Sequence, residues 1–191
     1  DPDISLQAPV RTGYVFEGWY RDAGLTMPIR TIDPASAENY TIYAKWSNPI
    51  RYTVQWDLND GTLAGPPAVN PNSGMAGYTV EDADFVMQSA SRPGYAFEGW
   101  YDNAALLGTP ITTLRTMDAE NKHYYAKWSA PLQYPVRYEL NDSAASPAVV
   151  PASNLLRYSI ETNGGGTIQL SPAFRQGYDF LGWYDNAAFA G

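Results

Sequence analysis

The stretch Gly13-Tyr14-Val15-Phe16-Glu17-Gly18-Trp19-Tyr20 occurs three times in this chain with few changes. Its second copy spans residues 94–101 and its third spans residues 177–184, at spacings of 81 and 83 residues. Self-similarity at a nearly fixed spacing indicates that one structural unit is repeated in tandem. We therefore expect units of about 80 residues, each built around this stretch as a core strand.

The repeat divides the 191 residues into three units and two short linkers. We predict that residues 1–47 are the C-terminal part of a first repeat and that residues 52–129 are a complete second repeat. Residues 134–191 are then a third repeat without its closing strand. The linkers, residues 48–51 and 130–133, each contain a proline.

Composition favours short strands joined by turns. Hydrophobic residues make up 45% of the chain and aromatic residues 14%, far from the composition of disordered segments. There are 16 Gly and 15 Pro, and Thr, Tyr and Val are common while long Leu/Lys/Glu runs are missing. We predict a mainly β chain with minimal helix, and in the second unit one helical turn near residues 112–121.

The opening of each later unit alternates between apolar and polar residues. In residues 52–58 this pattern places Tyr52, Val54 and Trp56 on one face, as in a half-buried strand. The third unit has Pro135 in its opening strand, and proline cannot donate a hydrogen bond to a neighbouring strand. That strand is therefore expected at a sheet edge, or with this position facing away from its neighbour.

Comparing the three copies distinguishes structural residues from residues that could do chemistry. Glu17 and Glu98 are replaced by Leu181 in the third copy, which a general acid or base would not tolerate. We therefore predict surface carboxylates here and no enzymatic activity. Five positions of the motif that are identical in all copies define its structural pattern: Gly13, Tyr14, Phe16, Gly18 and Trp19; Gly94, Tyr95, Phe97, Gly99 and Trp100; and Gly177, Tyr178, Phe180, Gly182 and Trp183. The tyrosine that ends the motif, Tyr20, Tyr101 or Tyr184, is identical as well.

An arginine precedes the motif in every copy, as Arg11, Arg92 and Arg175. Its guanidinium group is expected to stack on an aromatic ring or to pair with a carboxylate, in preference to binding a ligand. 

The invariant tryptophan allows two interpretations. Strict alternation puts Trp19 on the same face as Val15 and Glu17, where it would be exposed. A bulge at the preceding glycine would instead turn the indole inward, and we favour this. The candidate binding residues are therefore Trp19, Trp100 and Trp183, together with Tyr43 and Tyr125 on the outer face of the closing strands.

Several classes of function are disfavoured. The net charge of −8 and the pI of about 4.5 argue against binding to nucleic acid or direct contact with an anionic membrane. Without cysteine the chain forms no disulfide or thiolate metal site, and His123 is its only histidine. The segment from Asp57 to Gly61 lacks the ligand spacing of a calcium loop, so we expect a turn there and no metal or cofactor.

Three motifs together resemble a known repeat family. They are the opening Tyr52-Thr53-Val54-Gln55-Trp56-Asp57-Leu58-Asn59, the central motif with its preceding arginine, and the closing Tyr125-Ala126-Lys127-Trp128. This combination resembles the Listeria-Bacteroides repeat, also called the internalin B repeat. The resemblance implies small β-grasp-like units strung in tandem in large bacterial surface or secreted proteins, as a stalk or an adhesion segment.

Two functional hypotheses follow. The first is a non-catalytic stalk or adhesion segment at the bacterial cell surface, with any targeting signal outside this sequence. The second is a multivalent module whose exposed aromatic side chains bind a carbohydrate or a protein, with avidity from tandem copies. Its partner would be a glycan or a protein of the host or of a bacterial surface. Unpaired strand edges in the third unit would also favour association with another chain.

Overall fold

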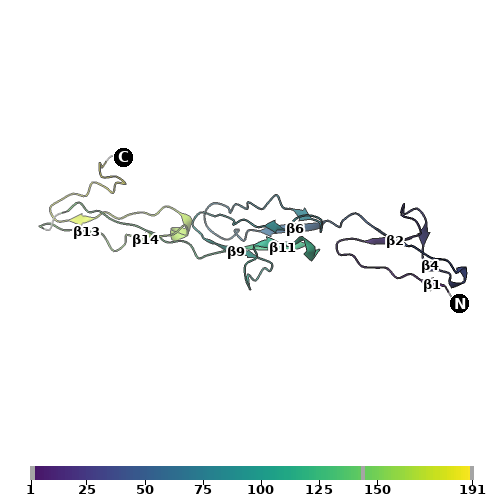
Figure 1. Cartoon of the computed structure of the whole chain (residues 1–191). Helices are drawn as coiled ribbons and strands as arrows, with labels where there is room; N and C mark the ends of the chain where they lie inside the picture. Colours follow the sequence, from purple (N-terminus) through teal and green to yellow (C-terminus); the bar gives the residue numbers. More distant parts are fainter. Residues whose placement is uncertain (1–2, 143–144, 190–191) are drawn as a thin grey trace. The chain divides into compact units, whose positions relative to one another are not determined.

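The computed structural model describes residues 3–142 and 145–189. Short strands joined by irregular segments make up most of the described chain, as Figure 1 shows. The helices in these residues are three 3-10 helices: η1 (Pro34–Ser36), η2 (Thr116–Asp118) and η3 (Thr162–Gly165). The mainly β prediction is confirmed, and η2 lies where a helical turn was predicted. None of these helices is long and apolar enough to cross a membrane.

The first repeat contains a three-stranded sheet in the order β3-β2-β5, and a second pair β1-β4. The invariant motif supplies β2, which pairs with β5 in antiparallel fashion. The register between them shifts between Phe16 and Gly18, where Gly18 has a φ of +140°. The bulge predicted at the second glycine of the motif is therefore present. The strands are β1 (Ile4–Ser5), β2 (Phe16–Tyr20), β3 (Pro28–Ile29), β4 (Thr31–Ile32) and β5 (Tyr43–Trp46).

The second repeat contains a four-stranded sheet in the order β7-β6-β11-β9. The first and last strands of the repeat, β6 and β11, are neighbours and run parallel, with Lys122 opposite Val54. β7 pairs antiparallel with β6, and β8 and β10 form a separate pair. The strands are β6 (Tyr52–Asp57), β7 (Gly77–Tyr78), β8 (Phe85–Val86), β9 (Phe97–Tyr101), β10 (Thr113–Leu114) and β11 (Lys122–Trp128).

The described residues of the third repeat form two-stranded pairs only. β12 (Tyr134–Pro135) pairs with β14 (Arg157–Tyr158), so Pro135 lies in an edge strand as predicted. β13 (Ala148–Val149) pairs with β15 (Phe174–Arg175). The prediction of a core strand was wrong for residues 177–184, which form no strand in the structure. No strand corresponding to β11 lies beside them in the described residues to hydrogen-bond with them.

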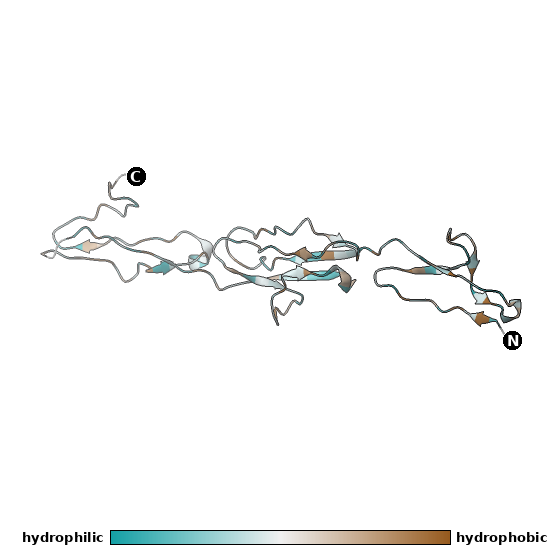
Figure 2. Cartoon of the chain, viewed as in Figure 1, coloured by the Kyte–Doolittle hydropathy of each residue, from teal (hydrophilic) through white to brown (hydrophobic). Residues whose placement is uncertain are grey.

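The most buried side chains belong to the second repeat. β6 alternates as predicted, with Val54 buried between the exposed Thr53 and Gln55, and Figure 2 shows the corresponding change of hydropathy along the strand. The large buried side chains that line this core are Tyr78, Trp100, Leu114 and Tyr124. The core therefore consists mainly of aromatic rings, which bury a large area per residue.

Edge-to-face ring pairs tie the motif strand to the closing strand in the same way in two repeats. Phe16 and Trp46 have ring centroids 5.5 Å apart, and Phe97 and Trp128 have centroids 5.4 Å apart. The Phe of the motif and the Trp of the closing strand are thus a packing pair.

Contacts group the chain into two compact units that cut across the repeats. One unit comprises residues 1–57, 70–89 and 99–126, and the other comprises residues 58–69, 90–98 and 127–191. Each unit contains chain from two successive repeats. The side-chain contacts described below lie within one unit or the other.

Candidate functional site

The invariant tryptophans each donate a hydrogen bond from the indole to a backbone carbonyl twelve residues earlier. Trp19 donates to Gln7 at 2.9 Å, Trp100 to Gln88 at 2.9 Å and Trp183 to Ser171 at 3.0 Å. Trp100 is only 2% exposed, so its ring is not accessible for stacking on a sugar in this conformation. Trp19 and Trp183 are half-buried.

A buried asparagine completes this arrangement in the second repeat. Asn72 is 2% exposed, and its amide donates to the Gln88 carbonyl at 2.8 Å while its oxygen accepts from the Gln88 N–H at 2.7 Å. Asn154 forms the corresponding pair of bonds with Ser171 in the third repeat. In both repeats the asparagine side chain pairs with the backbone N–H and C=O of one residue, as a neighbouring strand would. These backbone groups would otherwise be costly to bury.

The predicted tyrosines of the closing strands lie at the surface to different extents. Tyr43 is 37% exposed, whereas Tyr125 is half-buried and stacks on His123 with ring centroids 4.2 Å apart. On the same strands, Lys45 pairs with Glu17 at 3.2 Å and Lys127 with Glu98 at 3.6 Å. These ion pairs are well solvated, and such pairs contribute little to stability.

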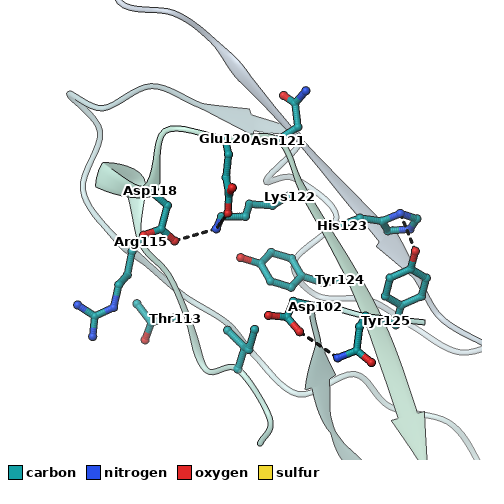
Figure 3. A pocket seen from close by; sticks show the side chains of 12 residues that line it. Asp102, Thr113, Arg115, Asp118, Glu120, Asn121, Lys122, His123, Tyr124 and Tyr125 are labelled. Atoms are coloured by element: carbon teal, nitrogen blue, oxygen red, sulfur yellow. Dashed lines mark hydrogen bonds and ion pairs between the residues drawn. The ribbon is translucent and has the colours of Figure 1, made fainter. Parts of the chain in front are cut away.

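A hollow of about 540 Å³ lies beside β11 in the second repeat (Figure 3). Its wall includes Asp102, Lys122, His123 and Tyr125. Lys122 contacts Asp118 at 2.7 Å and Glu120 at 2.6 Å. Burial alone would lower the pKa of Lys122, but its hydrogen bonds to these two carboxylates outweigh burial and raise it. The lysine charge is therefore already neutralised by its neighbours.

The first repeat does not keep two of the polar side chains that line this hollow. Thr41 corresponds to His123, and Arg21 replaces Asp102. The Arg21 guanidinium instead lies over the ring of Tyr40, 4.6 Å from its centroid. A binding site shared by all repeats would keep its polar side chains, and at these two positions the first repeat does not.

The arginine before each motif stacks on the motif tyrosine. The guanidinium carbon lies 3.7 Å from the ring centroid for Arg11 and Tyr14, 5.0 Å for Arg92 and Tyr95, and 4.0 Å for Arg175 and Tyr178. Stacking was one of the two roles predicted for this arginine.

Arg92 also holds the turn that follows the opening strand. It is 5% exposed and donates to the carbonyls of Asp60 at 3.1 Å and Leu63 at 2.8 Å. Asn59 has a φ of +48°, and Asp60 accepts the Ala68 N–H at 2.7 Å. These contacts define a turn in this segment, as the sequence predicted.

The first two residues of the motif contact the next repeat. Gly13 has a φ of +77°, and a β-carbon on it would lie 2.5 Å from the methyl groups of Val80. The Tyr14 hydroxyl donates a hydrogen bond to Glu81, which raises the pKa of Tyr14. Val80 and Glu81 follow the strand β7 of the second repeat, so this contact joins the first repeat to the second.

The second repeat contacts the third through equivalent residues. A β-carbon on Gly94, whose φ is +81°, would lie 2.8 Å from Ile160. The Tyr95 hydroxyl donates to Glu161 at 2.7 Å, and burial together with this bond raises the pKa of Tyr95. We call this arrangement the junction: the Gly-Tyr pair of one repeat against the Val/Ile-Glu pair of the next.

A short turn presents the Val/Ile-Glu pair in both junctions. In the second repeat, Asp82 accepts hydrogen bonds from the Thr79 N–H at 2.7 Å and from the Thr79 hydroxyl at 3.0 Å. These two bonds lower the pKa of Asp82. In the third, Thr162 accepts the Ser159 N–H at 2.7 Å. Side-chain oxygens that bond nearby backbone N–H groups stabilise such turns.

The linkers are hydrogen-bonded to the glycines of the two junctions. Ile50 donates its N–H to the Gly13 carbonyl at 2.8 Å, and Leu132 donates to the Gly94 carbonyl at 2.8 Å. The chain therefore leaves each repeat beside the residues that contact the next repeat.

The Gly-Tyr pair of the third repeat has the same local geometry without this contact. Gly177 has a φ of +80°, and Tyr178 donates its N–H to Arg175 at 3.2 Å, as in the other copies. No described atom lies within 4 Å of a β-carbon built on Gly177, and Tyr178 is 61% exposed compared with 6% for Tyr95.

Sequence reasoning missed the junction and the buried asparagines. A signal for the junction is present in the sequence. Residues 79–82 align with residues 159–162, and both segments have a hydroxyl residue, then a β-branched residue, then Glu. These residues lie outside the aromatic motifs that the comparison of copies emphasised.

Comparisons with known proteins agree with this repeat structure. The family model of the Listeria-Bacteroides repeat domain matches residues 3–45, 52–127 and 134–191, so the chain belongs to the Listeria-Bacteroides repeat family. It is 29% identical over 183 residues to a protein of Evansella cellulosilytica described as "Putative membrane protein". It is 25% identical over 179 residues to another protein of that organism, described as "Putative Gly-rich membrane protein".

These matches cover 93% of this chain in both alignments, but only 24% and 18% of the relatives. The chain thus spans about a quarter or less of their length. No solved structure matches it.

Proposed function

We propose that the chain is a non-catalytic stalk segment of a bacterial cell-surface or secreted protein, which spaces other domains and contributes weak adhesion. The observation that carries this proposal is the junction, which recurs between successive repeats with equivalent residues. In the first and second repeats the Gly-Tyr pair of the motif is engaged in this contact, and the Phe and Trp of the motif are engaged in packing. Labelling of the relatives as membrane proteins supports a surface location.

The β-grasp-like description of each unit belongs to the same proposal. The parallel pairing of β6 with β11 in the middle of the order β7-β6-β11-β9 supports it.

A stalk needs a defined geometry across each junction, and spin-label distances measure this. The chain has no cysteine, so cysteine pairs can be introduced at exposed positions. Val10→Cys with Val86→Cys spans the first junction, and both side chains are well exposed, at 96% and 70%. Val86→Cys with Met117→Cys is the control within one repeat.

We expect the distance distribution across the junction to be nearly as narrow as that of the control pair. A broad distribution across the junction beside a narrow control would mean that the repeats move independently, and it would exclude the stalk proposal.

The second candidate function is multivalent binding of a carbohydrate or a protein through exposed aromatic side chains. The observation that favours it is the 37% exposure of Tyr43, whose counterpart Tyr125 lines the hollow beside β11. The test is glycan-array binding by the intact chain and by the Tyr43→Ala and Tyr125→Ala variants. Binding lost in both variants would support this function, and equal binding by all three proteins would exclude these residues. Association through the strand edges of the third repeat remains a further prediction, which sedimentation at high protein concentration tests.

A further inference from the structure

The geometry points to an interaction surface at Arg175, Gly177 and Tyr178 that accepts the Ser/Thr-Val/Ile-Glu turn of a further repeat of this family. This inference rests on the proposed stalk function, because it extends the same junction by one repeat. We call these three residues the acceptor surface.

The acceptor surface already has the conformation that its occupied counterparts have. Gly177 has a φ of +80°, compared with +77° for Gly13 and +81° for Gly94. The guanidinium of Arg175 lies over the ring of Tyr178, as Arg92 lies over Tyr95. Binding a partner would therefore cost little rearrangement of the backbone, which favours affinity.

The shape of the surface selects a β-branched residue. Val80 and Ile160 occupy the space where a side chain on Gly13 or Gly94 would stand, at 2.5 Å and 2.8 Å from the built β-carbons. The space at Gly177 is open among the described residues. A branched aliphatic side chain of similar size fits there, and the absence of a side chain on Gly177 is what makes room for it.

The chemistry of the surface selects a carboxylate beside that aliphatic residue. Tyr14 and Tyr95 each donate their hydroxyl to a glutamate of the following repeat. Tyr178 is 61% exposed, so its hydroxyl is accessible to such an acceptor. A phenol donating to a carboxylate is a charge-assisted hydrogen bond, which is stronger than a neutral one. The occupant is therefore a turn with the sequence of residues 159–162 or 79–82.

A chain extended at its end by its own sequence provides the test. Gly191 aligns with Gly108, so adding residues 109–191 after Gly191 supplies a closing strand and a fourth repeat. Tyrosine nitration by tetranitromethane, mapped by mass spectrometry, reports the accessibility of each ring. In the 191-residue chain we expect Tyr178 to react several-fold faster than Tyr95. In the extended chain its rate should fall to that of Tyr95.

The matched control carries Ile160→Asp and Glu161→Gln in the added copy only, and it should restore fast nitration of Tyr178. A shorter extension by residues 109–162 provides the same turn if the longer chain does not fold. Fast nitration of Tyr178 in the folded extended chain, with Tyr95 protected, would overturn the acceptor surface alone. Equal, fast nitration of Tyr95 and Tyr178 in the 191-residue chain would overturn the junction itself, and with it the stalk proposal.

Discussion

The hydroxyl of Tyr95 donates a 2.7 Å hydrogen bond to Glu161, although the two residues belong to different repeats. A neighbouring contact, Gly94 against Ile160, excludes any side chain at the glycine. The most invariant residues of the sequence therefore serve two purposes. Phe and Trp hold one repeat together, whereas Gly and Tyr hold successive repeats to each other.

Replacing Gly94 by Ala should destabilise the chain more than replacing Gly177 by Ala. Both glycines have a left-handed backbone, which costs an ordinary residue about 1–2 kcal/mol. Only the Gly94 variant also collides with Ile160, and overpacking adds about 1–3 kcal/mol. Denaturant unfolding of both variants measures the difference. If both variants lost the same free energy of unfolding, Ile160 would be able to move away from the new methyl group at no cost.

Removing the Tyr95 hydroxyl should weaken the second junction and leave the fold of each repeat intact. Tyr95→Phe keeps the ring under Arg92 and removes the hydroxyl that donates to Glu161, at a cost of about 1 kcal/mol. Combining it with Glu161→Gln should cost less than the sum of the two changes, because both remove the same interaction. Strict additivity in this double-mutant cycle would contradict the bond. Tyr178→Phe is the control and should change stability little.

Replacing Asn72 by Ala should expose how much the buried amide contributes. The change leaves the Gln88 N–H without its 2.7 Å acceptor, and an unsatisfied buried group costs about 1–3 kcal/mol. Hydrogen exchange of the Gln88 amide should accelerate more than that of amides in β5. Ser73→Ala, a change at an exposed position of the same loop, is the comparison, and similar effects of both changes would mean that the loop as a whole matters and not this amide.

The second repeat should lose stability at alkaline pH. Burial raises the pKa of Tyr124 from 10.0 to about 12. Because the folded value lies above the unfolded one, this stabilisation is complete below pH 10 and is lost as the pH rises towards 12. Tyr124→Phe should therefore make unfolding less dependent on pH in this interval, as followed by tryptophan fluorescence. Tyr43→Phe, at an exposed position, is the control and should leave the pH dependence of unfolding unchanged.

Much of the repeat architecture was predictable from local patterns. The alternation in β6, the bulge at Gly18 and the edge position of Pro135 all follow from rules that involve neighbouring residues. The junction was not predictable in this way, because Gly94 and Ile160 lie far apart in the sequence and their contact depends on how two repeats meet. Asn72 was also missed, since asparagine in a Pro/Asn/Gly-rich loop resembles an ordinary turn residue. The third copy of the motif forms no strand because pairing requires a neighbour that the described residues do not supply.

The near-identity of the two junctions has a consequence for the gene. A recombination event that removes one whole period would bring Gly13 and Tyr14 against Ile160 and Glu161 in place of Val80 and Glu81. At the two contacting positions the new joint would differ from the old one by a single methylene group, and the turn behind them would have Ser159 and Thr162 in place of Thr79 and Asp82. Copies can therefore be lost or gained in frame without designing a new interface, so the length of such a protein can change between generations while every joint keeps its chemistry.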